Sequence, residues 1–204
     1  MPVRVADYID RAALAPAPGH LAPWEWTRDA PTLIQAALAT LGADYFIADS
    51  GDVAVHPSAT VEDGSQIKGP AIIGPHCLVA RTALIRGGCW LDAACIVGPA
   101  CELKSSYLFA GAKLAHLNFV GDSVIGAGAN IEAGAMIANY RNERADKRIR
   151  IRSGEIIIDT GAEKFGALVG DGARIGANAV IAPGALLAAG AIVARLSLID
   201  QGAP

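Results

Sequence analysis

Three cationic side chains recur at one fixed interval in the first half of the chain. Lys68, Arg86 and Lys104 are 18 residues apart, and each follows a large aliphatic residue by one position. A column of like charges lowers stability unless an anion or an acidic neighbour compensates it, and phosphate oxygens are strong partners for arginine and lysine. The spacing therefore favours a phosphate site, with long solvated side chains as the alternative.

One histidine accompanies this column. His116 follows Leu114 by two positions, where the repeat described next turns side chains outward rather than into the core. Imidazole changes its charge near neutral pH, so an outward histidine is suited to accepting a proton. The alternative is a histidine whose hydrogen bonds are satisfied within the fold.

The elements that must position these groups are defined by large aliphatic residues that recur every six positions. This period fits neither a helix nor an isolated strand, and it predicts a parallel β-helix of hexapeptide repeats. Three hexads close one coil, so residues 18 apart stack at the strand spacing of about 4.8 Å. The register shortens by one residue twice, and it returns a third time after a long interruption. The inward aliphatics are Val55, Val61, Ile67, Ile73, Val79, Ile85, Leu91, Val97, Leu103, Leu108, Leu114, Val120, Ile125, Ile131, Ile137, Val169, Ile175, Ile181, Leu187 and Val193.

The four cysteines occupy the small inward position of this repeat, four residues after an aliphatic. They are expected to be buried apolar groups, because free cysteine packs as a small hydrophobe. No Cys-x-x-Cys pair occurs, so neither a disulfide nor a structural metal is predicted. The four residues are Cys77, Cys89, Cys95 and Cys101.

Two segments lie outside the repeat and divide the chain into a cap of residues 1–52 and a β-helix of residues 53–204. The cap contains an amphipathic helix with Asp29 as its N-cap, Gly42 as its stop and one apolar stripe. We expect this helix to cover the open end of the coil, where a free strand edge invites aggregation. The stripe residues are Leu33, Ile34, Ala37, Leu38 and Leu41, and Trp24 and Trp26 are expected to pack beside them.

The second segment is an insertion at residues 138–168. Residues 148–152 alternate arginine with isoleucine, Ser153-Gly154 can turn, and residues 155–158 return, which predicts a projecting β-hairpin. Six basic residues gather in the insertion, and they form either a solvated strand face or an anion-binding arm. They are Arg141, Arg144, Lys147, Arg148, Arg150 and Arg152.

Composition excludes several partners. The chain has 204 residues, is 52% apolar and 18% charged, and carries a net charge of −3, so no global basic field attracts nucleic acid or anionic lipid. Residues 175–194 are uncharged for about the length of a membrane helix, but they contain Asn178 and Pro183 and keep the six-residue period. The charged N-terminal residues lack the apolar core of a signal peptide, which predicts a cytoplasmic protein.

Four stretches carry a resemblance to a known family: His116-Leu-Asn-Phe-Val-Gly-Asp, Asn130-Ile-Glu-Ala-Gly, Asn139-Tyr140 and Lys164-Phe-Gly-Ala-Leu-Val-Gly-Asp. Over residues 53–199 the chain resembles the acetyltransferase half of the bifunctional glucosamine-1-phosphate acetyltransferase and N-acetylglucosamine-1-phosphate uridyltransferase, in the archaeal type with the hairpin insertion. The resemblance implies a left-handed β-helix, a homotrimer with active sites between subunits, and acetyl-CoA as co-substrate. No Gly-rich nucleotidyltransferase motif precedes the repeat, so uridyl transfer would fall to a separate partner.

The resemblance also implies roles for individual residues. His116 matches the general base that takes a proton from the sugar amine as the amine attacks the thioester. The sugar is contacted at positions matching Phe119, Asn130, Asn139, Tyr140 and Lys147, its phosphate at Arg86 and Lys104, and coenzyme A at Ala177 and Arg195. Two positions depart from the pattern, since Phe119 replaces a tyrosine and Ala177 replaces a serine of the bacterial type.

Three functions compete on these grounds. The first is a CoA-dependent acyltransferase that N-acetylates a phosphorylated or nucleotide-linked amino sugar. The second is a non-catalytic trimeric scaffold that binds sugar nucleotides, which the departure at Phe119 favours. The third is a metal-dependent hydratase on the same fold, which needs three converging histidines. The register of His20, His56, His76 and His116 does not bring three of them together.

Overall fold

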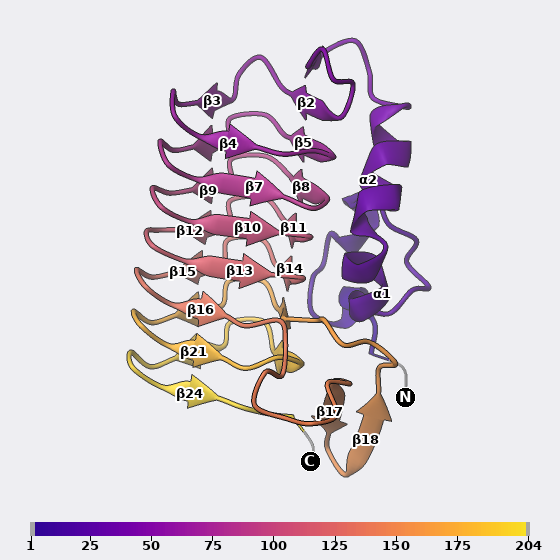
Figure 1. The fold of residues 1–204 in the computed structure, drawn as a ribbon, viewed down its shortest axis with the longest axis vertical. Helices are drawn as coiled ribbons and strands as arrows, with labels where there is room; N and C mark the ends of the chain where they lie inside the picture. Colours follow the sequence, from indigo (N-terminus) through magenta and orange to yellow (C-terminus); the bar gives the residue numbers. More distant parts are fainter. Residues whose placement is uncertain (1–2, 203–204) are drawn as a thin grey trace.

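Each hexad becomes one short strand and one corner, and the stacked strands form three parallel sheets around a common core. The structure is a computed structural model that describes residues 3–202. Its main body is a left-handed parallel β-helix of hexapeptide repeats, as predicted, with one helical segment along its side and one projecting hairpin (Figure 1).

Three sheets form the three faces of the coil, and the strands of each follow one another in hydrogen-bonded order. The first sheet contains β1 (Phe46–Ile47), β2 (Val53–Val55), β5 (Ala71–Ile73), β8 (Cys89–Leu91), β11 (Tyr107–Leu108), β14 (Val124–Ile125), β19 (Ala167–Val169) and β22 (Ala185–Leu187). The second contains β4 (Gln66–Ile67), β7 (Leu84–Arg86), β10 (Glu102–Lys104), β13 (Phe119–Gly121), β16 (Met136–Ile137), β21 (Val180–Ile181) and β24 (Leu198–Ile199). The third contains β3 (Thr60–Val61), β6 (Leu78–Val79), β9 (Ile96–Val97), β12 (Lys113–Leu114), β15 (Asn130–Ile131), β20 (Arg174–Ile175) and β23 (Ile192–Val193).

Strand pairing confirms the register read from the sequence. Ile73 pairs with Leu91 at a spacing of 18 residues, whereas Leu91 pairs with Leu108 at 17, which is the first shortened coil. The long insertion projects from between two neighbouring coils and leaves their stacking intact, because Ile125 pairs directly with Val169. The inward aliphatics from Ile73 onward are buried in one continuous core.

The four cysteines lie in this core as free, buried thiols, which confirms their predicted packing role. Burial raises the pKa of the Cys89 thiol to about 11, because a thiolate is poorly solvated there. Cys89 is therefore a neutral packing group rather than a nucleophile.

The predicted helix packs on a side of the coil, so its expected place over the open end is wrong. Helix α2 (Ala30–Leu38) contacts β5 and β8 of the first sheet, and α1 (Pro23–Arg28), which was not predicted, precedes it (Figure 1). The cause lies in the outward residues of that sheet. Ile72, Trp90 and Tyr107 are apolar, and the cap helices bury them. At the N-terminal end of the coil, β1 instead pairs antiparallel with β2.

Details of the cap also differ from the expected stripe. Asp29 is at the N-cap position of α2, but its carboxylate binds Arg28 instead of a helix amide. Ile34 and Leu38 are buried with Ala30, whereas Leu33 is only half-buried. Trp24 and Trp26 are buried against Phe165 and Tyr107, as predicted. Two short 3-10 helices, η1 (Val5–Asp7) and η2 (Ala12–Leu14), complete the cap.

The insertion forms the predicted hairpin from β17 (Arg150–Ser153) and β18 (Ile156–Asp159), which pair antiparallel around a turn containing Gly154. The basic residues of this hairpin are largely ion-paired locally, since Asp146 accepts from both Arg148 and Arg150. Residues 175–194 form strands β20 to β23 and their corners, and no helix among residues 3–202 is long and apolar enough to span a bilayer. The division of the chain at residue 52 stays a prediction.

Candidate functional site

Five of the predicted site residues meet in one cleft of about 540 Å³, which we call the Tyr140 cleft. The strands of the second sheet provide one wall, because Arg86 ends β7, Lys104 ends β10 and Phe119 begins β13. The first and last segments of the insertion provide the other wall. The lining residues are Arg86, Lys104, Phe119, Asn139, Tyr140, Glu163 and Lys164.

The stacked cations of this cleft have carboxylate partners. Lys104 and Arg86 are neighbours in adjacent strands, as the 18-residue spacing predicted. Lys104 Nζ lies 2.7 and 2.9 Å from the two oxygens of Asp122, and Arg86 lies 2.6 Å from Glu102 Oε1. Acidic neighbours thus neutralise the stacked cations, which is one of the two forms of compensation considered from the sequence. The binding of a phosphate by Arg86 and Lys104 stays a prediction.

Asp122 connects the cation column to the sugar-contact positions, and sequence reasoning did not select it as a site residue. Its buried carboxylate accepts hydrogen bonds from both Lys104 and Asn139 Nδ2. Gly121 makes this approach possible, since a Cβ there would lie 2.7 Å from Asn139 Nδ2. The sequence signal was the aspartate that closes the motif beginning at His116.

Lys147 stabilises the loop behind the cleft rather than lining it. Its Nζ donates to the carbonyl oxygens of Arg141 and Asn142 and lies 5.3 Å from the Tyr140 ring centroid. Lys164 lines the cleft instead, and within residues 3–202 it has no hydrogen bond or ion pair. The lysine that suits a ligand is therefore Lys164, which begins one of the four family-like stretches but was not among the predicted site residues.

Arg141 fixes the loop that carries Asn139 and Tyr140. Its side chain is 2% exposed, and its guanidinium donates to both oxygens of Asp200 at 2.7 and 2.9 Å and to the Pro183 carbonyl at 2.7 Å. This arrangement is a bidentate charge-assisted pair, the strongest hydrogen-bonded form available to arginine. Arg141 thus ties the start of the insertion to the C-terminal strands.

His116 is exposed at the corner between β12 and β13 and lies outside the Tyr140 cleft. The buried Asn118 holds this corner, because its Oδ1 accepts from the His116 amide and its Nδ2 donates to the Glu132 and Ala135 carbonyls. The His116 corner precedes the strands of the second sheet, whereas Asn139 follows them. The two residues therefore lie at opposite ends of one face of the coil.

The predicted coenzyme A residues gather with Asn130 on the third sheet. A cleft of about 260 Å³ is lined by Asn130, Glu132, Arg174 and Arg195 among others. Arg195 forms an ion pair with Glu132 at 2.8 Å, which lowers the pKa of that carboxyl, and the Ala177 amide donates to the same carboxylate. Asn130 is thereby separated from Asn139 and Tyr140, with which it had been grouped. Among residues 3–202 no cluster of three potential metal ligands occurs.

Comparison with known proteins supports the resemblance noted in the sequence. No family model matches the chain. It is 38% identical over 124 residues to the bifunctional protein GlmU of Nitratidesulfovibrio vulgaris, covering 58% of this chain and 27% of that protein. It is 35% identical over 126 residues to GlmU of Acidithiobacillus ferrooxidans, covering 61% and 26%. The chain thus spans about a quarter of the length of these relatives.

Two of the solved structures that match the chain are acetyltransferases by name. The acetyltransferase domain of PglB from Neisseria gonorrhoeae aligns over 91% of this chain and 73% of that chain, with 21% identity and a TM-score of 0.45. A mutant of perosamine N-acetyltransferase from Caulobacter crescentus, in complex with CoA and GDP-perosamine, aligns over 39% and 48%, with 26% identity and a TM-score of 0.22.

Proposed function

We propose that the protein is a CoA-dependent acyltransferase that acetylates the amine of a phosphorylated or nucleotide-linked amino sugar. The observation that carries this proposal is the Tyr140 cleft, where two aromatic rings lie beside three cations and an amide. Binding sites commonly combine apolar walls with a few placed polar groups, and cations that meet phosphate oxygens add charge-assisted hydrogen bonds. The identity with GlmU proteins supports acetyl-CoA as the donor.

The chemistry requires the protein to move only one proton. The sugar amine attacks the thioester carbonyl, an N–C bond forms, and the C–S bond breaks to release coenzyme A. His116 accepts the proton that the amine loses and then gives it to the departing sulfur, so coenzyme A leaves as a thiol and the imidazole is neutral again. General-base assistance of this kind lowers the barrier because it removes the positive charge that develops on the nitrogen as the N–C bond forms. Arg195, which lines the third-sheet cleft, and Ala177, whose amide donates to Glu132 of the same cleft, would hold the coenzyme there.

A binding scaffold without catalysis is the second candidate. Phe119 lacks the hydroxyl of the family's tyrosine, and His116 lies apart from the Tyr140 cleft within one chain. A scaffold would bind sugar nucleotides but would not consume acetyl-CoA. In either case, we propose that a separate nucleotidyltransferase acts before or after this protein.

A thermal-shift screen tests the proposed ligands. A molecule that binds only the folded protein raises the melting temperature, by an amount that grows with its concentration over Kd. We expect shifts from acetyl-CoA and from glucosamine 1-phosphate or UDP-linked amino sugars, with sugars lacking phosphate giving less. A shift from sugar nucleotides without any from acetyl-CoA would favour the scaffold.

We predict a homotrimer, which the family resemblance implies. One chain leaves His116 and Asn139 at opposite ends of a coil face, so a second chain is needed to bring the two groups together. A neighbouring subunit can bring its own His116 corner against the Tyr140 cleft, so the complete site would lie between two chains. Light scattering should therefore give three times the chain mass at the concentrations used for assay. A stable monomer with full transfer activity would contradict this arrangement.

Lys164→Ala is expected to weaken the binding of phosphorylated amino sugars by about 10- to 150-fold, since a lost charge-assisted contact costs about 1.5–3 kcal/mol. Lys164 is exposed and, among residues 3–202, unpaired, so the substitution leaves no buried partner behind. Lys113→Ala is the matched control, because Lys113 is also an exposed lysine and lines neither the Tyr140 cleft nor the third-sheet cleft. Equal loss of affinity in both variants, measured by calorimetry, would remove Lys164 from the phosphate site.

A further inference from the structure

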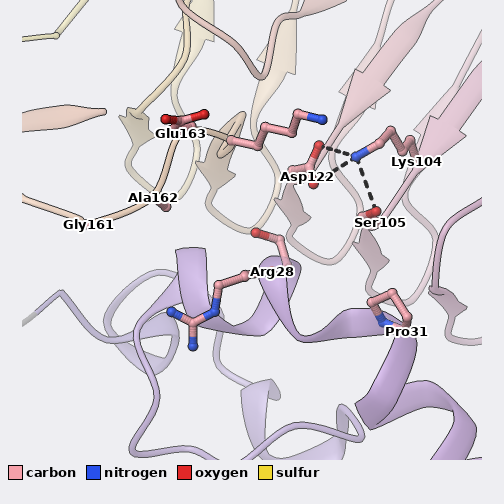
Figure 2. Close-up of a pocket in the computed structure, with 10 residues that line it drawn as sticks. Arg28, Pro31, Lys104, Ser105, Asp122, Gly161, Ala162 and Glu163 are labelled. Atoms are coloured by element: carbon pink, nitrogen blue, oxygen red, sulfur yellow. Dashed lines mark hydrogen bonds and ion pairs between the residues drawn. The ribbon is translucent and has the colours of Figure 1, made fainter. Parts of the chain in front are cut away.

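A second cavity, of about 390 Å³, opens between the N-terminal cap and the coil (Figure 2). Arg28 at the end of α1 and Pro31 in α2 form one wall, and Lys104 and Ser105 lie opposite them on the coil. Gly161 and its neighbours, which return from the hairpin, close the third side. Three segments far apart in the sequence thus enclose one volume, which we call the cap cavity.

The cap cavity adjoins the Tyr140 cleft. Lys104, Glu163 and Lys164 line both of them, so these residues form a shared boundary. Two of the three are cations, and a phosphate is the group that such a boundary suits. A sugar in the Tyr140 cleft whose phosphate lies at this boundary would direct any substituent of that phosphate into the cap cavity.

The lining of the cap cavity carries three cations, Arg28, Lys104 and Lys164, and two carboxylates, Asp122 and Glu163. The Arg28 guanidinium binds both oxygens of Asp29 and points away from Lys104 (Figure 2). Lys104 and Asp122 pair with each other, so Lys164, which has no partner within residues 3–202, is the cation of the lining that is open to a phosphate. The Arg28 side chain is about half exposed, so it is free to rotate, and contact with a ligand in the cavity requires that its guanidinium turns from Asp29 toward the coil.

The size and lining of the cap cavity fit more than a single phosphate. Volumes of roughly 300–1,000 Å³ are typical of sites for whole small molecules. Pro31 and Ala162 provide apolar surface beside the cations. This mixture of apolar surface and positive charge suits a nucleoside joined to a phosphate, whereas a sugar monophosphate would leave the cavity empty.

We infer that the cap cavity binds the nucleoside diphosphate portion of the acceptor, so that the substrate class is a nucleotide-linked amino sugar. This inference rests on the proposed function and narrows it. The shared lysines contact the phosphate nearer the sugar, and Arg28 contacts the phosphate nearer the nucleoside. The cap is then part of the substrate site and not only a cover for the first sheet.

Calorimetry with UDP, GDP and dTDP, and separately with glucosamine 1-phosphate, tests the inference. At least one nucleoside diphosphate should bind tighter than inorganic phosphate. Arg28→Gln and Arg28→Glu should weaken that binding at least about tenfold more than they weaken the binding of glucosamine 1-phosphate. Arg4→Glu is the matched control, because Arg4 is also an exposed cap arginine paired with an acidic neighbour, Asp7, and lies outside the cavity lining.

The outcomes separate this inference from the proposed function. If acetyl transfer proceeds equally well on sugar monophosphates and sugar nucleotides, and Arg28 variants bind diphosphates normally, the cap-cavity assignment is wrong and the acyltransferase stands. If diphosphates bind in an Arg28-dependent way while no acetyl transfer occurs, the subsite stands and the proposed activity fails. Unchanged melting temperatures of the Arg28 variants exclude unfolding as the cause.

Discussion

His116→Ala is expected to lower the turnover of acetyl transfer by about 100- to 10,000-fold, the range that general-base assistance contributes. The side chain is exposed, and the corner that carries it is held by Asn118 through backbone contacts. Removal of the imidazole should therefore leave the fold, the oligomer and coenzyme A binding intact. Steady-state kinetics should show the loss in kcat, because the proton is transferred only as the reaction proceeds.

His20→Ala is the control for this experiment, since His20 is exposed in the cap and lines none of the three clefts. It should retain the parent rate. Activity in the His116 variant equal to that of the parent, on any amino sugar the parent accepts, would assign the proton transfer to another group.

The second large effect concerns stability. Asp200→Ala is expected to destabilise the folded state by about 3 kcal/mol, the lower end for breaking a buried ion pair, because the Asp200 carboxylate is partly exposed. The cost arises from Arg141, whose buried guanidinium would lose its bidentate partner. Arg141→Met should cost less, since it removes the buried charge and leaves the carboxylate near solvent. Urea unfolding measures the free energy of unfolding of both variants. A larger loss in Arg141→Met than in Asp200→Ala would contradict the role given to the buried guanidinium.

The same pair predicts a pH dependence. The hydrogen bonds from Arg141 hold the pKa of Asp200 below its usual value. A carboxyl whose pKa is lower in the folded state stabilises that state above its unfolded pKa of about 3.9, and the contribution disappears as the pH falls through the lowered folded value. The stability difference between the parent and Asp200→Asn should thus be full at neutral pH and shrink only under acidic conditions.

The inward register of the coil could be predicted residue by residue, because each buried position is confined to one aliphatic or one small side chain. Both shortened coils and the place of the insertion were confirmed for the same reason. The position of the cap helix was predicted wrongly because its packing depends on residues that point outward from the coil. Ile72, Trp90 and Tyr107 are 17 or 18 residues apart in the sequence, and their common apolar surface becomes evident only when the coils stack.

The candidate site, too, could be predicted from the sequence only in part. Arg86, Lys104 and the Asn139-Tyr140 pair meet in one cleft, as residues matched by spacing or motif should. The carboxylate partners were not foreseen, since Asp122 adopts a left-handed backbone conformation that points it back to Lys104. Lys147 and Lys164 could not be ranked from sequence, because the path of the hairpin decides which lysine returns to the cleft.

Transfer of an acetyl group from coenzyme A to an amino sugar is the activity that we propose for this chain. The most direct measurement incubates the purified protein with acetyl-CoA and a panel of amino-sugar phosphates and nucleotide-linked amino sugars, and follows free coenzyme A thiol together with the mass of the sugar product. We predict thiol release that requires both substrates, is matched by N-acetylated sugar and falls strongly in His116→Ala. Binding of the sugars and of acetyl-CoA without either product would contradict the claim and leave the protein as a scaffold.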